Sequence, residues 1–209
     1  MTIYIPTYFK VTDVNEIRDF IQKNSFGTLV TTKQGTPIAS HLPLQLNKQG
    51  DDYYITGHMA YGNAQWKTFE VENENVLVLF QGPHAYVSST WYKDENVPTW
   101  NYQSVHVYGT ASIMSEQELE EDLSLLLQKY EHHRENAALW ENLSPQTKKQ
   151  IKGIVGFKIK VQEIQAANKL SQNRNEEDYH NIVNKLYEEK DLNSQQMAKL
   201  MERKLKKNK

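Results

Sequence analysis

Two short stretches of the sequence concentrate side chains that could bind a ligand. In the first, His58, Asn63 and Trp66 place an aromatic ring close to two polar groups. Ligand pockets combine aromatic walls with a few convergent polar groups, so this pattern indicates a pocket. The same residue types also satisfy backbone groups at a strand-to-helix corner, with the indole as a plug. Both interpretations are open.

The second stretch, residues 169–174, holds two cations and three further hydrogen-bonding side chains within six positions. Cations and planar guanidinium groups are the usual donors to phosphate and carboxylate, so this composition favours an anion site. The alternative is a structural loop that fixes the last segment of the chain in place.

Histidine and cysteine usage bears on metal chemistry. The chain has seven histidines and no cysteine, which excludes disulfides, thiolate catalysis and cysteine zinc sites. His58, His84 and His106 share a β-rich region, so a metal or haem site is an alternative to consider. His132 and His133 are adjacent in a predicted helix and diverge, which disfavours chelation. We predict no metal site and no catalytic residues, since no nucleophilic triad, P-loop or dinucleotide motif occurs.

Charge and hydropathy narrow the setting in which the chain acts. The net charge is −2, so the whole molecule has no basic footprint for nucleic acid, although residues 199–209 carry six basic side chains against one glutamate. No apolar run approaches the roughly 20 residues that cross a bilayer. The first ten residues lack the order of a signal peptide. We expect a cytoplasmic protein with no membrane partner.

The elements that must position these side chains are mainly strands. Alternating or β-branched segments predict strands at 28–32, 38–46, 53–58, 76–80, 86–88 and 105–113, with a late strand at 155–161. Gly35 and the pair Asp51–Asp52 mark turns between them. About six short strands with tight connections are typical of a barrel or sandwich.

Helices are predicted around and after these strands. Capping-box patterns begin helices at Asp13 and Ser115, and Ser144 followed by Pro145 begins another that ends at Gly153. Residues 62–71 predict a short helix. After Asn173 the sequence becomes rich in lysine and glutamate, with helices over 175–190 and 193–207. We therefore predict a domain at 1–174 and a helical appendage at 175–209.

Several longer blocks carry a family resemblance in their order along the chain. They are YIP at 4–6, HLPL at 41–44, GHMAYGNAQW at 57–66, FQGPHAYVS at 80–88, VPTWNY at 97–102 and KLSQNR at 169–174. Together they resemble the ordered motifs of the PaiB family from about Tyr4 to Arg174. Two positions depart from that pattern. Tyr61 stands where a basic residue is expected, and Ser89–Thr90 stands where relatives read Ser-Pro.

The resemblance implies an α+β, mainly β fold: a six-stranded split β-barrel related to pyridoxamine-phosphate oxidase and flavin reductases, with peripheral helices. Such proteins are usually homodimers with sites at the subunit interface, and the Trp91–Tyr92 and 100–102 blocks suit an interface or a pocket wall. By analogy of fold, the cofactor FMN would place its ring beside Ser40, His41 and Leu42. Its phosphate would lie near Thr56, His58, Ala60 and Asn63. Trp66, Trp100, Lys169, Ser171 and Arg174 complete the predicted cofactor-binding set.

The family resemblance also implies a function. It predicts a negative transcriptional regulator of protease synthesis and sporulation genes that responds to a flavin or another small anionic ligand. No helix-turn-helix is recognisable, so DNA and a protein partner are both open. The alternative is an FMN-dependent oxidoreductase or a flavin-binding module without DNA binding, with a haem-binding split barrel as a further alternative.

Overall fold

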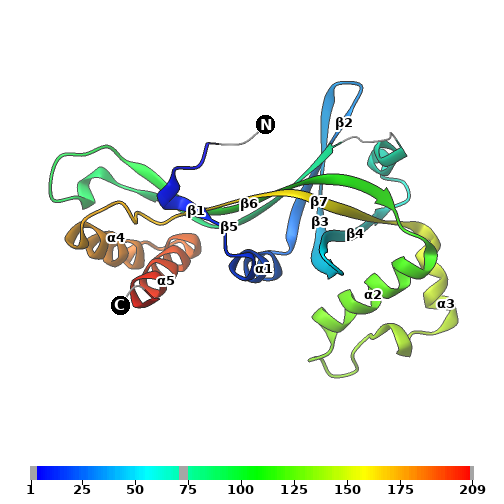
Figure 1. The fold of residues 1–209 in the computed structure, drawn as a ribbon. Helices are drawn as coiled ribbons and strands as arrows, with labels where there is room; N and C mark the ends of the chain where they lie inside the picture. The colour runs from blue at the N-terminus through cyan, green and yellow to red at the C-terminus, as the bar shows by residue number, and fades with distance from the viewer. Residues whose placement is uncertain (1–3, 71–74, 208–209) are drawn as a thin grey trace. The chain divides into compact units, whose positions relative to one another are not determined.

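The computed structural model describes residues 4–70 and 75–207 (Figure 1). The chain divides into two compact units. Unit 1 comprises Met1–Phe20, Gln81–Val105 and Gln165–Lys209, and unit 2 comprises Ile21–Phe80 and His106–Ile164. Each unit is therefore built from segments that are distant in the sequence.

Six long strands form a closed ring. Their bounds are β2 Phe26–Lys33, β3 Thr36–Gln49, β4 Asp52–Ala60, β5 Asn75–Val87, β6 Thr99–Ile113 and β7 Ile154–Lys169, with a short β1 at Lys10–Val11. The hydrogen-bonded order is β1-β7-β4-β3-β2-β5-β6, and β6 also pairs with β7. This confirms the predicted six-stranded barrel.

Strand β5 differs from the sequence prediction, which divided it into two. Gly82 and Pro83 are typical of turns, yet the strand continues through them. The buried positions alternate up to Gly82 and resume out of phase at Ala85 and Val87. Proline in a strand commonly accompanies such an irregularity, because it cannot donate a hydrogen bond. The turn-like residues therefore mark a shift of register and not an end.

The core of unit 2 lies inside the ring. Its fully buried side chains include Leu29, Leu44, Ile55, Phe80, Phe157 and Ile159. On β4, Ile55, Gly57 and Met59 alternate inward, as the period of a strand requires. Burial of each large aliphatic side chain contributes about 1.5–3 kcal/mol, which makes this cluster the main source of the unit's stability.

Helices α1 (Val14–Lys23), α2 (Glu116–Glu131) and α3 (Pro145–Lys148) begin where the sequence predicted. Ser115 accepts a hydrogen bond from the backbone of Glu118, and the Glu118 side chain accepts one in return, so the capping box is confirmed. Short 3₁₀ helices complete the set: η1 Thr7–Phe9, η2 Ala64–Glu70, η3 Ser89–Trp91, η4 Trp140–Asn142 and η5 Lys149–Gly153. The last of these ends at the predicted Gly153.

Unit 1 contains helices α4 (Glu176–Glu188) and α5 (Leu192–Lys207), which pack side by side (Figure 1). Ile182, Leu186, Met197 and Met201 are completely buried between them. Ala85 and Val87 of β5 belong to the same cluster, so the helices share a core with strand segments of this unit. The boundary at residue 174 remains a prediction.

No helix within residues 4–70 and 75–207 is long and apolar enough to cross a membrane.

Ring closure requires a close approach of two strands at Gly109. A Cβ atom added there would lie 2.1 Å from the backbone oxygen of Lys160 on β7. We expect Gly109→Ala to lower the free energy of unfolding by about 3 kcal/mol, since the backbone itself must move. Urea denaturation followed by circular dichroism measures this.

Gly153→Ala is the matched control. A Cβ atom at Gly153 would have no neighbour within 4 Å, so its effect should stay within about 0.5 kcal/mol. Equal effects of the two substitutions would show that β6 and β7 do not approach as closely as described.

Candidate functional site

Two residues of the predicted cofactor-binding set are linked by a hydrogen bond in unit 2. The side-chain amide of Asn63 donates a hydrogen bond to the Ser40 hydroxyl at 2.8 Å, which links the β4–η2 turn to β3. The same Asn63 side chain accepts a bond from the backbone N–H of Gln65 at 3.1 Å. Asn63 therefore has the structural role that the sequence left open, and it also holds Ser40 in place.

Two pairs of aromatic rings lie in the same unit. Because Ser40 and His41 are consecutive on β3, the His41 ring lies on the opposite face of the sheet from the Ser40 hydroxyl. The His41 ring stacks against Phe26, with centroids 6.3 Å apart, and Phe26 is 70% exposed. Tyr61 and Trp66 have centroids 5.5 Å apart, and the Trp66 indole donates to the backbone oxygen of Tyr61 at 3.0 Å. Exposed planar faces of this kind suit a flat aromatic ligand. Leu42 lies next to His41 on β3 and is half-buried.

Gln65 is a positioning residue that sequence reasoning missed. Its buried side-chain amide lies 3.2 Å from the Leu29 backbone oxygen and 3.2 Å from the Thr31 hydroxyl. It also lies 3.3 Å from the Ile38 backbone oxygen. One amide thus ties η2 to β2 and β3. A glutamine in a short polar helix has no sequence signal that separates this role from a solvated one.

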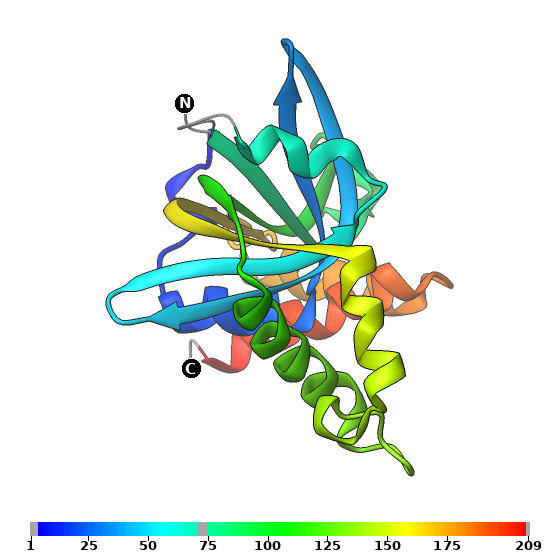
Figure 2. The same ribbon diagram turned by 90° about the vertical axis from the view of Figure 1, so that its right-hand side faces the viewer.

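Thr56, His58 and Ala60 occupy the other face of β4, away from the core. Thr56 is buried and its hydroxyl accepts a hydrogen bond from the Asn47 amide at 2.8 Å. His58 is half-buried, whereas Ala60 is exposed at the end of the strand. Figure 2 shows α2 next to the β3–β4 hairpin in this unit. The residues predicted to hold phosphate therefore face, in part, a helix.

Helix α2 brings a buried carboxyl group to this face. Asp122 is 5% exposed, and burial raises its pKa above the ordinary value, with partial opposition from a Thr56 hydrogen bond and from His58. Burial lowers the pKa of His58, and the charge of Asp122 opposes that shift. His58 Nδ1 and Asp122 Oδ1 are both buried without a hydrogen-bond partner. Sequence reasoning missed Asp122, because it lies in an acidic run that resembles a solvated helix face.

Helix α2 is held in place by three contacts. The Lys158 ammonium, and after it the capping-box hydrogen bond from Ser115, lower the pKa of Glu118 to about 2. Lys158 on β7 forms an ion pair with Glu118. Next along the helix, Leu119 packs where Gly156 has no side chain. The position of Asp122 is therefore a fixed feature of the unit.

A flavin fits these residues at its ring and not at its phosphate. The exposed His41–Phe26 pair suits an isoalloxazine ring. Near Thr56 and His58, however, a phosphate would meet a carboxyl group and a histidine that burial keeps neutral. Lys67 is a nearby cation, but its ammonium lies 5.6 Å over the Trp66 ring. Helix η2 has seven residues and cannot supply an extended helix dipole.

The remaining predicted residues belong to unit 1. Trp100 is 53% exposed, with ring centroids 6.0 Å from those of His84 and Tyr86. Lys169 donates to the Thr99 hydroxyl. The buried Ser171 is hydrogen-bonded to Asn101 at 2.9 Å, and Arg174 stacks on Tyr92. Among the described residues of both units, no three histidine, aspartate or glutamate side chains meet as a metal site would require.

Comparison with known proteins gives this arrangement a context. Residues 3–163 match the family described as "Putative FMN-binding domain". The chain is 64% identical over 206 residues to "Protease synthase and sporulation protein PAI 2" of Bacillus subtilis, a match that spans 98% of this chain and 99% of the relative.

Solved structures share the fold at low sequence identity. The flavocytochrome Anf3 from Azotobacter vinelandii aligns with a TM-score of 0.63 and 16% identity, over 85% of this chain and 78% of that one. The FAD and heme binding protein from Mycobacterium smegmatis aligns with a TM-score of 0.60 and 15% identity, over 77% and 73% of the two chains. At this identity the likeness shows the split-barrel fold alone.

The buried carboxyl of Asp122 predicts a pH-dependent stability. Its raised pKa means that the folded protein keeps this proton to higher pH than the unfolded chain, so its contribution falls as the pH rises above 3.8. The lowered pKa of His58 has the opposite effect on stability. Below pH 6.5 the unfolded chain binds the proton more readily than the folded protein does, so stability falls as the pH falls. We expect Asp122→Asn to be more stable than the wild type by about 1 kcal/mol near pH 8 and equal to it near pH 4.

Urea unfolding at several pH values measures this difference. Glu121→Gln on the exposed side of the same helix removes one charge as well, and should change stability by less than about 0.5 kcal/mol at every pH. A stability gain for Asp122→Asn that did not grow with pH would contradict the buried-carboxyl interpretation.

Proposed function

We propose that this chain, which belongs to the PaiB family, is a negative regulator of protease synthesis and sporulation genes that binds FMN. One observation carries the regulatory part: 64% identity over nearly the whole length of both chains with a relative named for protease synthesis and sporulation. Because 64% of the aligned residues are identical, the two proteins can be expected to contact the same partners.

The flavin part of the proposal rests on the family and on the exposed aromatic rings at β3. The family description names an FMN-binding domain, and the match covers the β3–β4 region. Of the two faces of β3, the one that carries the His41 and Phe26 rings would contact the flavin ring. A bound flavin would supply a redox-active ring, through which the chain could respond to the state of the cell.

The proposal also includes assembly as a homodimer in the cytoplasm, with DNA or a protein as the regulatory partner. Trp100 and Tyr86 offer exposed aromatic surface of the kind that interface cores contain. Light scattering after gel filtration measures the assembly, and a monomeric mass would remove this part of the proposal.

Complementation tests the regulatory role. We expect this chain, expressed in Bacillus subtilis lacking the related protein, to restore wild-type levels of secreted protease and of sporulation. The same strain without this chain is the negative control. Failure of the folded wild-type chain to complement would contradict the proposal. If promoter DNA bound no better than random DNA over a salt series, repression would have to act through a protein partner.

Flavin titration tests the ligand. We expect the fluorescence of FMN to be quenched on binding. His41→Ala should weaken that binding about threefold to tenfold, because the variant loses an exposed ring on which the flavin could stack. Gln49→Ala, at the exposed far end of the same strand, should leave the affinity unchanged.

If the fluorescence of neither FMN nor riboflavin were quenched, flavin binding would be contradicted, and the regulatory proposal would be unaffected. Bleaching of the bound flavin by NADH would instead favour the oxidoreductase alternative.

A further inference from the structure

Among the described residues of unit 1, two cations form no ion pair with a carboxylate. The Lys169 ammonium donates to the Thr99 hydroxyl and lies 6.0 Å over the Phe9 ring. The Arg174 guanidinium lies 4.3 Å over the Tyr92 ring, with one amino group 3.4 Å from its hydroxyl. Within the described part of the chain, the ion pairs involve other cations. The contacts that position these two cationic side chains are therefore made with neutral groups.

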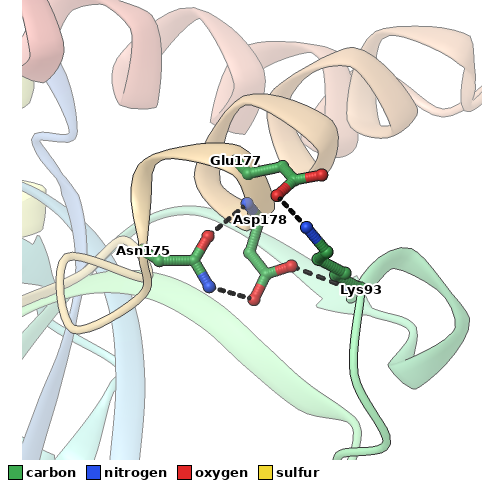
Figure 3. A network of polar contacts seen from close by, with 4 residues as sticks. All are labelled: Lys93, Asn175, Glu177 and Asp178. Atoms are coloured by element: carbon green, nitrogen blue, oxygen red, sulfur yellow. Dashed lines mark hydrogen bonds and ion pairs between the residues drawn. The ribbon is translucent and has the colours of Figure 1, made fainter.

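A neighbouring cation in the same unit is treated differently. Lys93 forms an ion pair with Glu177 at 2.9 Å, and its backbone N–H donates to Asp178 (Figure 3). Asn175 caps helix α4 through the Asp178 backbone N–H. The carboxylates in the first turn of α4 thus bind Lys93, and Asn175 caps the start of the helix. The nearby carboxylates do not neutralise Arg174.

A turn in the loop brings the two cations toward each other, since the backbone N–H of Arg174 donates to the Ser171 backbone oxygen at 3.0 Å. Partial burial lowers the pKa of Lys169, and the charge of Arg174 lowers it further. Like charges held together are unfavourable in the protein alone, whereas an anion between them would reverse the sign of the interaction. This is the electrostatic arrangement that a bound phosphate or carboxylate stabilises.

The loop that carries these cations is held by hydrogen bonds on several sides. Ser171 adopts a left-handed backbone with φ of 59°, which is unfavourable for a residue other than glycine. The buried Asn101 holds its hydroxyl, and the Gln172 side chain accepts from the Leu170 backbone N–H at 2.7 Å. Gln172 also donates to the Tyr8 backbone oxygen at 3.2 Å. A strained loop fixed on several sides presents its cations in a preorganised geometry, which reduces the entropic cost of binding.

A purely structural role of the loop explains the hydrogen bonds of Ser171, Gln172 and Asn101. It does not explain why the residues at the two ends are cations. Phe9 and Tyr92 would pack as well against an uncharged aliphatic side chain, without the cost of partly burying an ammonium group. The loop is therefore structural at its centre, while Lys169 and Arg174 at its two ends call for another explanation.

We propose that Lys169, Arg174 and the Thr99 hydroxyl bind the phosphate group of a small molecule. Thr99 accepts from Lys169, so its own proton is available to donate to an oxyanion. The guanidinium offers a planar fork that matches two phosphate oxygens. The site uses residues of unit 1 alone and extends beyond the proposed function, because it would bind phosphate whether or not the chain regulates genes. A free phosphate ester and the phosphate of FMN would supply the same chemistry.

Titration of the full chain with inorganic phosphate tests the site. In ¹H–¹⁵N spectra, we expect saturable shifts of the Arg174 side-chain Nε–H signal and of the backbone amides of residues 170–175. Chloride at the same ionic strength should not reproduce them. Lys169→Met, which keeps the aliphatic stem, should weaken phosphate binding about tenfold, since it removes one charge-assisted hydrogen bond.

Lys93→Met is the matched control, because it removes the same charge from the same unit and should leave phosphate affinity unchanged. Thermal melting identifies a variant that does not fold, and Arg174→Lys then replaces Lys169→Met: it keeps the charge, loses the fork and should bind several-fold more weakly. The proposed site would be overturned if folded Lys169→Met bound phosphate with wild-type affinity. It would also be overturned if chloride caused the same changes in chemical shift.

Competition separates the two sources of phosphate. Displacement of phosphate by FMN but not by riboflavin would identify the flavin phosphate as the occupant. Displacement by neither would leave the site to another phosphate ester. His41→Ala should retain phosphate binding, so loss of the flavin surface and loss of this site are distinguishable.

Discussion

Strand β7 is paired on both of its sides, with β4 and with β6, and the rest of the structure depends on this double pairing. Without it, the six strands would form an open sheet with two exposed edges. Closure removes those edges and encloses the side chains of Leu44, Ile55 and Phe157. It also imposes local requirements, which glycine meets at two positions: Gly109 allows the approach of the Lys160 backbone, and Gly156 leaves room for Leu119 of α2.

The packing of α2 against the ring determines the electrostatics of the outer face of β4. Leu119 enters the space above Gly156, and one turn later Asp122 is carried against Thr56 and His58. A buried carboxyl group then lies where the split-barrel analogy would place a phosphate. The face of β3 that carries His41 and Phe26 has exposed aromatic rings instead. The two parts of a flavin mononucleotide would therefore meet different conditions within unit 2.

Among the described residues of unit 1, Lys169 and Arg174 carry positive charge and form no ion pair with a carboxylate. The proposed phosphate site would let a chain of net charge −2 bind an anionic ligand. Affinity for a phosphate depends on the local arrangement of a few donors and not on net charge. The neutral aromatic and hydroxyl groups around these two side chains keep the cations available, because no internal ion pair has to be broken on binding.

The sequence by itself was sufficient for the barrel, the helix starts and the family. Period-two alternation identified the strands, and the side chains of Ser115 and Ser144 cap helices locally, so neither inference needed tertiary information. Local pattern failed at Gly82 and Pro83, since turn-typical residues also occur within a strand whose register shifts.

The tertiary structure alone decided which polar residues act as positioning groups. Gln65 and Asp122 belong to polar segments, and they become buried only because strands distant in the sequence pack against them. In the same way, residues 169–174 were recognisable as an anion-binding composition. That Lys169 and Arg174 have no carboxylate partner among the described residues followed only from the fold, because ion pairing depends on neighbours that the chain brings together in space.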